Sequence, residues 1–167
     1  ALMATSSHLA KVQEPCQRPT EVVEKRREDQ FEDFINSKNK QVLDLQKQGK
    51  WHEAEKIHRE VLEVRHQFLG EDHPDTLDSM NNLAVVFREQ GKWQEAEKMQ
   101  REDHELRRQV LGEDHPDTFG SMSYLALVLQ EAGKWQEAEK IHREVMEGMR
   151  RVLGEEHQDT LISMHNW

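Results

Sequence analysis

The sequence repeats itself every 42 residues, and this period limits the possible folds more than any other feature does. The phrase Gly-Lys-Trp begins at Gly49, Gly91 and Gly133. A second phrase, Leu-Gly-Glu-Asp-His-Pro-Asp-Thr, begins at Leu69 and Leu111 and returns in a varied form at Leu153. Because two independent phrases keep the same step, we interpret the chain as a tandem array whose units stack to bury a shared core.

Each unit contains two stretches in which apolar residues recur at helical spacing. In the second unit, the first stretch has apolar residues three or four positions apart, at Leu77, Met80, Leu83, Ala84 and Phe87. The second stretch has a similar stripe, at Trp93, Ala96, Met99, Leu106 and Val110. No stretch alternates with period two. The sequence therefore predicts an all-α, right-handed solenoid of antiparallel helix pairs.

Turn and capping residues predict where these helices begin and end. The first helix of the second unit is expected to begin near Asp75 or Thr76, either of which can cap free amide groups, with Pro74 just outside the helix. It should stop at Gly91, and the second helix should end at Gly112. The His-Pro-Asp triplets are thus interpreted as linker and helix cap.

The pattern resembles the tetratricopeptide repeat. The residues that carry the resemblance are Leu83-Ala84, Phe87, Gly91, Trp93 and Ala96, at the spacing of that family's Leu-Gly, aromatic, Gly, aromatic and Ala positions. A 42-residue unit with this linker and the phrase Asn-Asn-Leu-Ala is similar to the kinesin light chain subclass, which is also common in fungal NACHT or NB-ARC receptors. Residues 49–90 and 91–132 share 26 of 42 positions, which favours the receptor arrays.

The period also predicts how the chain is organised. Residues 1–19 are expected to form a flexible arm and residues 20–33 an N-terminal capping helix. The repeats follow at 34–74, which diverges, at 75–116 and at 117–158, with 159–167 as the truncated start of a fourth. Between Thr20 and Gln48, one long helix or two abutting helices are expected. Three apolar residues of this segment, Phe31, Phe34 and Ile35, are expected to cover the end of the stack of helices.

Composition narrows the class of protein. Hydrophobic residues make up 35% and charged residues 34% of the chain, which fits thin helix pairs with much solvated surface. The net charge of −10 argues against a nucleic-acid partner. Cys16 is the only cysteine, and no apolar run is long enough for a membrane span or a signal peptide. We therefore expect a cytoplasmic protein without a membrane partner.

Enzymatic, metal and cofactor sites are not predicted. The ten histidines include no pair with the spacing of a helical metal motif. Most of them recur once per unit, as His58 and His142 or as His73, His115 and His157, which indicates a scaffold role. The lone cysteine lies in the expected arm, and no acid–base pair stands apart from the periodic charges.

The resemblance implies a binding groove lined by the first helix of each unit. Its ligand-facing positions, on either side of the Leu-Ala pair, correspond to Asn36, Asn39, Lys40, Leu43 and Lys47, to Asp78, Asn81, Asn82, Val85 and Arg88, to Gly120, Ser123, Tyr124, Leu127 and Gln130, and to His165 and Asn166. Asn82 and Asn166 match an asparagine that in similar arrays hydrogen-bonds a peptide backbone. Lys40 replaces this asparagine in the first unit and Tyr124 replaces it in the third. The alternative is a solvated inner face without a ligand.

Asp103 and His104 depart from the repeat pattern. The first unit has Val61 and Leu62 at these positions and the third has Val145 and Met146. A buried carboxylate costs several kcal/mol unless it is paired. One hypothesis is a weak seam at which the array opens, and the other is drift tolerated by a neighbouring hydrogen bond. Gly148, which replaces Val64 or Leu106, is a second departure and suggests a bend.

The resemblance implies a non-enzymatic module that binds a protein or peptide segment. Lys40, Lys47 and Arg88 are expected to select acidic groups in that segment. The parent protein would be an NLR-like receptor whose repeats act as a sensor, or else a kinesin-light-chain-like cargo adaptor. A different class of function is an oligomerisation scaffold, in which an exposed C-terminal repeat joins copies of the chain.

Overall fold

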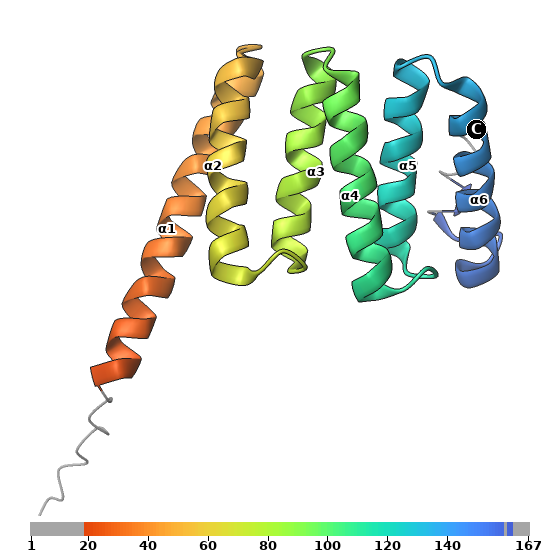
Figure 1. Cartoon of the computed structure of the whole chain (residues 1–167). Helices are drawn as coiled ribbons and strands as arrows, with labels where there is room; N and C mark the ends of the chain where they lie inside the picture. Colours follow the sequence, from red (N-terminus) through yellow and green to blue (C-terminus); the bar gives the residue numbers. More distant parts are fainter. Residues whose placement is uncertain (1–18, 159, 162–167) are drawn as a thin grey trace, which may run out of the picture. The chain divides into compact units, whose positions relative to one another are not determined.

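The computed structural model describes residues 19–158, 160 and 161. Its helices are α1 (Pro19–Lys47), α2 (Trp51–Leu69), α3 (Pro74–Glu89), α4 (Trp93–Leu111), α5 (Pro116–Glu131) and α6 (Trp135–Leu153), shown in Figure 1. The all-α prediction is confirmed for this part of the chain. The flexible arm up to residue 18, Cys16, His165 and Asn166 lie outside it.

Two compact units, residues 1–37 and 38–167, divide the chain within α1. α1 is assigned as one helix, as the first of the two alternatives for this segment expects. The role of Phe31, Phe34 and Ile35 as an end cover stays a prediction. In the unit of residues 38–167, each helix from α2 to α6 packs against the next one along the chain.

The core of this unit follows the repeat. The stripe expected on α3 is buried in full, from Leu77 to Phe87. Ala54, Ala96 and Ala138, one per unit, are completely buried, and their small side chains let neighbouring helices approach closely. Leu83 and Phe87 of α3 form a cluster with Ala96 of α4 and Val128 of α5, so the core continues from one unit into the next.

The stripe expected on α4 is partly wrong. Val110 is 46% exposed, whereas the residues of α4 that are buried are Ala96, Gln100, Asp103 and Arg107. Three of these four are polar, so a search for apolar residues misses the face that points inward. The apolar residues Trp93, Met99 and Leu106 lie beside that face and are half-buried.

The expected start of α3 is also wrong. Pro74 is its first residue rather than lying outside it, and the cap is His73 rather than Asp75 or Thr76. Nδ1 of His73 accepts a hydrogen bond from the Asp75 amide at 3.2 Å, and His115 and Asp117 repeat this contact at 3.1 Å. Proline suits the first helical position because it has no N–H to leave unpaired. The imidazole nitrogen takes the place of the usual side-chain oxygen.

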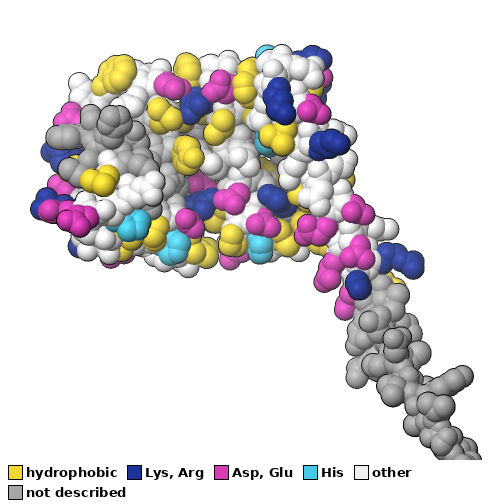
Figure 2. All heavy atoms as spheres, turned by 180° about the vertical axis from the view of Figure 1, so that it is seen from behind, with side chains coloured by type: hydrophobic (Ala, Val, Ile, Leu, Met, Phe, Trp, Pro, Cys, Tyr) yellow, Lys and Arg dark blue, Asp and Glu magenta, His cyan; other side chains and the backbone are white. Residues whose placement is uncertain are grey.

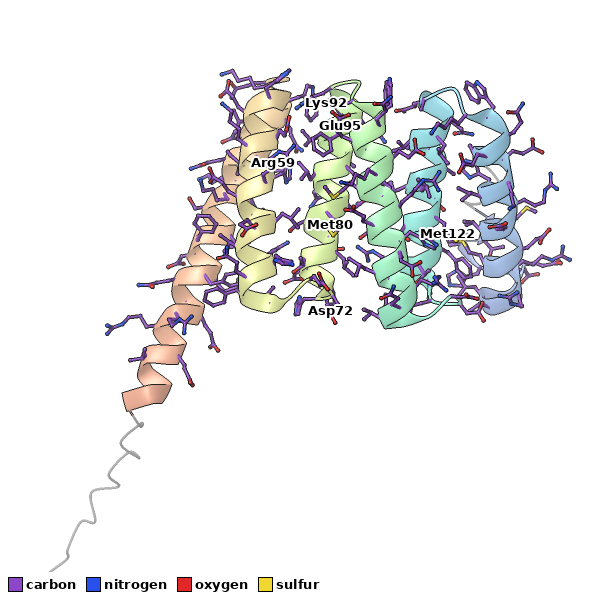
Figure 3. All side chains as sticks on the ribbon, in the orientation of Figure 1. Arg59, Asp72, Met80, Lys92, Glu95 and Met122 are labelled. Atoms are coloured by element: carbon purple, nitrogen blue, oxygen red, sulfur yellow. The ribbon has the colours of Figure 1, made fainter. Side chains whose placement is uncertain are left out.

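The lysines of the second and third Gly-Lys-Trp phrases each link a unit to the one before it. Lys92 Nζ lies 2.7 Å from Glu55 Oε2, and Lys134 Nζ lies 2.7 Å from Glu97 Oε2. Burial alone would raise the pKa of Glu55, but hydrogen bonds from Lys92 and Arg59 lower it to about 2. Lys92 and Arg59, labelled in Figure 3, also lie over the Phe87 ring, at 5.7 and 5.1 Å from its centroid. The repeated phrase thus encodes contacts between units.

Candidate peptide-binding groove

A groove of about 260 Å³ is formed by three successive helices. Helix α3 contributes Asp78 and Asn81, and α4 contributes Asp103 and Arg107. Helix α5 contributes Pro116, Asp117, Gly120, Ser121 and Tyr124. The groove therefore brings together Asp78, Asn81, Gly120 and Tyr124, which the resemblance assigns to the ligand-facing row, with the anomalous Asp103.

A buried ion-pair network forms the base of this groove. Asp103 is 1% exposed, and Arg107 Nε lies 3.0 Å from each of its carboxylate oxygens. The same guanidinium donates through Nη2 to Asp78 Oδ1 at 2.9 Å. Asp78 is exposed, so the network runs from the interior of α4 to the surface of α3. Burial raises the pKa of Asp103 to about 6, although Arg107 acts in the opposite direction.

Asn81 is held by a second polar contact. Gln100 is fully buried on α4, and its Nε2 donates to Asn81 Oδ1 at 2.7 Å. The first and third units have His58 and His142 at the position of Gln100. Because Asn81 Oδ1 is already occupied, the amide group of its side chain is the donor that a ligand in the groove could use.

His104 does not share the surroundings of Asp103. It is half-buried, and its Nδ1 lies 3.2 Å from Ser121 Oγ of α5. Burial lowers the pKa of His104, which favours the neutral ring. The two anomalous residues therefore point to different neighbours: Asp103 connects α4 to α3 through Arg107, and His104 connects α4 to α5.

The remaining residues of the expected ligand-facing row lie outside this groove. Those that are exposed are Asn36, Asn39, Lys40, Leu43 and Lys47 of α1 and Asn82 of α3. Those that are half-buried are Val85, Arg88, Ser123, Leu127 and Gln130. Arg88 contacts Glu89 at 2.8 Å and Glu131 at 3.6 Å, so nearby carboxylates already balance its charge. Figure 2 shows acidic, basic and hydrophobic side chains interspersed on the side of the molecule opposite to Figure 1.

Sequence reasoning missed Arg107, Pro116, Asp117 and Ser121. For Arg107 a signal was present, because the third unit has Met149 at the corresponding position and Arg107 lies four residues after Asp103 on one helix. Residues at this spacing are neighbours on a helix, so a basic residue there could pair with the carboxylate. Pro116 and Asp117 were assigned to linker and cap, which hid their contribution to the groove.

The histidines and acidic residues do not form a metal site in the part of the chain that the structure describes. Within residues 19–158, 160 and 161, no group of three or more His, Cys, Asp or Glu side chains is arranged to hold a metal ion. His58 and His142 are buried, and burial lowers the pKa of both. Over the same described residues, no helix combines the length and the hydropathy that a bilayer span requires.

Known structures share this arrangement of helices. A Podospora anserina protein, described as kinesin light chain with nearly identical TPR-like repeats, is 27% identical with a TM-score of 0.68 over 78% of this chain and 62% of that chain. BtubC (BKLC) from P. vanneervenii is 20% identical, with a TM-score of 0.64, over 81% of this chain and 63% of that one. NprR, solved with its cognate peptide NprX, is 18% identical, with a TM-score of 0.63, over 84% of this chain and 39% of that chain.

The family is defined by two matches to sequence models. Models described as tetratricopeptide repeat match residues 33–109 and residues 118–159. No curated protein matches the chain. The chain spans about three fifths of the length of the first two structures named above. The matches and the helical repeat fold together show that the chain belongs to the tetratricopeptide repeat family, whose domains generally mediate protein–protein interactions.

Proposed function

We propose that the chain binds a peptide or protein segment in the groove formed by α3, α4 and α5. The observation that carries this proposal is the meeting of Asp78, Asn81 and Tyr124 around one opening of about 260 Å³. These three side chains come from positions that bind ligands in similar arrays. The solved complex of NprR with its peptide supports the proposal, because that protein has the same fold.

The chemistry of the groove favours a segment with a basic side chain. Asp78 and Asp117 are both exposed at the groove, whereas Arg107 is already paired with Asp78 and Asp103. Tyr124 is exposed and offers an aromatic face over which a cation could lie. Gly120 leaves open space beside it, since a Cβ there would meet no atom within 4 Å. The groove thus differs from the acidic-ligand expectation, in which Arg88 and two lysines of α1 select the ligand.

Replacement of Gly120 tests this proposal. Gly120→Arg fills the open space at this position and adds a positive charge that repels a basic segment, and the helix should tolerate it because a Cβ there meets no atom within 4 Å. Peptides selected from a display library on the wild-type chain should bind this variant at least about tenfold more weakly, a loss of about 1.4 kcal/mol. Gln136→Arg adds the same charge at an exposed position of α6 and should leave affinity unchanged. Equal affinity for all three proteins would contradict the proposal.

A second candidate function, assembly of copies, rests on α6. Trp135 is 64% exposed, whereas Trp51 and Trp93 at the same position of earlier units are half-buried. Glu139 likewise is 57% exposed, and its counterparts Glu55 and Glu97 are covered by a lysine of the following unit. Two residue types that are more buried in the earlier units are therefore exposed on α6. Another copy of the chain or a further repeat would fit this surface of α6.

Mass measurement tests the assembly proposal. Light scattering coupled to size exclusion should give a mass above 19.8 kDa that rises with concentration. Glu139→Lys should reduce the association by removing the carboxylate that a partner lysine would approach. Glu144→Lys on the same helix is the control. A mass near that of one chain at every concentration would contradict assembly between copies.

We further propose that the module is the sensor region of a cytoplasmic NLR-like receptor, with a kinesin-light-chain-like cargo adaptor as the alternative. The similarity to the Podospora anserina repeats supports repeats of the kinesin light chain subclass, which are found in both the receptor and the adaptor class. The domains that the same gene encodes beside this array distinguish the receptor from the adaptor. A NACHT or NB-ARC domain would support the receptor, and a long heptad coiled coil would support the adaptor.

A further inference from the structure

A larger groove, of about 680 Å³, lies between α2 and α4. Its apolar lining consists of Leu62 from α2, Met80 from α3, and Met99 and Leu106 from α4. Figure 3 labels Met80, on α3 between α2 and α4. The lining is accessible because Leu62, Met99 and Leu106 are only half-buried. None of these residues belongs to the groove formed by α3, α4 and α5, so this is a separate surface.

The rim of the α2–α4 groove is acidic. Its carboxylates are Glu63, Glu71, Glu102 and Glu105. All four are exposed, so a partner can reach them. The one arginine on the lining, Arg101, is already paired with Glu97 and Glu137. His66, which lies 3.7 Å from Glu71, is the other group at the rim that can carry positive charge. The groove therefore combines an apolar floor with a rim of excess negative charge.

The next groove along the array has a different lining. A groove of about 380 Å³ between α4 and α6 is lined by residues 42 positions further on. There Met122 corresponds to Met80, but His104 and Gly148 replace Leu62 and Leu106. Its rim has two arginines, Arg108 and Arg151, beside four carboxylates, whereas the rim of the α2–α4 groove has one arginine beside four. Phe119 and Met122 are the apolar side chains of this lining, against four in the α2–α4 groove. Repeat packing alone therefore produces a groove, whereas the more extensive apolar floor lies between α2 and α4.

We propose that the α2–α4 groove binds an amphipathic helix of a partner protein, with apolar side chains on one face and lysine or arginine beside them. The apolar side chains would contact Leu62, Met80 and Leu106. Methionine suits such a surface because its flexible, polarizable side chain adapts to different partners. The basic residues would pair with Glu63 and Glu102 and would speed association, whereas Glu105 already contacts Arg108 at 2.8 Å. Recognition of this kind places the apolar face of a helix in a hydrophobic groove.

The first test uses a synthetic helix as the probe and the methionines as reporters. The probe has leucine on one face and lysine on the other, and its control has glutamate in place of lysine. In the chain labelled with ¹³C at its methionine methyl groups, the lysine helix should shift Met80 and Met99 saturably and leave Met122 unchanged. The glutamate helix should shift none of them. The absence of a shift at Met80, or an equal shift at Met122, would overturn the proposal.

The second test compares two matched charge reversals. Glu102 lies in the α2–α4 groove and Glu144 in the next one, and each has a side chain that is 51% exposed and 3.8 Å from a lysine one turn earlier. Glu102→Lys should weaken binding of the lysine helix about fivefold, and Glu144→Lys should leave it unchanged. Equal effects of the two would overturn the proposal. Gly120→Arg should not affect this probe, which separates the site from the α3–α5 groove.

Discussion

The ring of Phe119 occupies the space that a side chain at position 148 would need. A Cβ on Gly148 would lie 2.3 Å from Phe119 Cε1, closer than real Cβ contacts. At the corresponding positions the second unit has Leu77 and Leu106. The third unit has therefore exchanged two medium side chains for one large and one absent side chain, and α6 runs unbroken through Gly148. The residue that suggests a bend is explained by packing.

This packing predicts that positions 119 and 148 are coupled. Gly148→Leu alone should lower the free energy of unfolding by about 1–3 kcal/mol, because it overpacks the space that the ring fills. Phe119→Leu alone should also destabilise the chain, by leaving a cavity. The double variant restores the pair of the second unit and should be more stable than either single variant. Urea unfolding of the four proteins measures the coupling, and additive effects would contradict it.

The Asp103–Arg107 pair predicts a second double variant. Asp103→Val alone should lower the free energy of unfolding by about 3 kcal/mol, because Arg107 is left in the interior with only Asp78 as a partner. Asp103→Val with Arg107→Met installs the apolar residues of the third unit, Val145 and Met149. Replacement of a buried ion pair by apolar side chains often stabilises a protein, here by about 1–2 kcal/mol. A double variant that melts below the wild type would refute this expectation.

Asp103 also predicts how this gain depends on pH. Its pKa is raised from 3.8 to about 6 in the folded chain, so between these values the folded state holds the proton more tightly than the unfolded state does. The contribution of Asp103 to stability therefore falls as pH rises through this window. The advantage of the double variant over the wild type should be larger near about pH 7 than near about pH 4. Glu55 and Glu97 titrate in both proteins, so their effects cancel. A constant difference in unfolding free energy would contradict the shift.

The sequence predicted the architecture well because the same pattern of apolar and turn residues occurs in three successive units. The buried stripe of α3 and the class of fold follow from periodicity alone. The inward face of α4 could not be found in this way, because Gln100, Asp103 and Arg107 are polar. Gln100 and Arg107 depend on partners from α3, which are distant in sequence, whereas Asp103 pairs with Arg107 on the same helix. The spacing of apolar residues does not predict such pairs of polar side chains.

The groove was predicted only in part for a related reason. The resemblance pointed to one helix face, and Asp78, Asn81 and Tyr124 do line one opening. The floor of that opening comes from α4 and its edge from Pro116 and Asp117, the first two residues of α5. The cap was misassigned because the rule for side-chain oxygens does not anticipate an imidazole at His73. Local rules place residues on a helix, but tertiary contacts decide which of them meet.

The contact between Lys92 and Glu55 predicts that the Gly-Lys-Trp phrase stabilises the join between units. The Glu55 side chain is largely buried, so Lys92→Ala should leave its carboxylate with Arg59 as its remaining basic partner and lower the free energy of unfolding by about 1–3 kcal/mol. Because the folded-state pKa of Glu55 is lowered to about 2 from 4.5, its contribution is present above about pH 4.5 and is lost as pH falls toward 2. The cost of Lys92→Ala should therefore shrink in acid. Lys98→Ala, at an exposed lysine 3.8 Å from Glu102, is the control and should change stability little. Equal urea midpoints for the two variants at neutral pH would show that the lysine does not hold the units together.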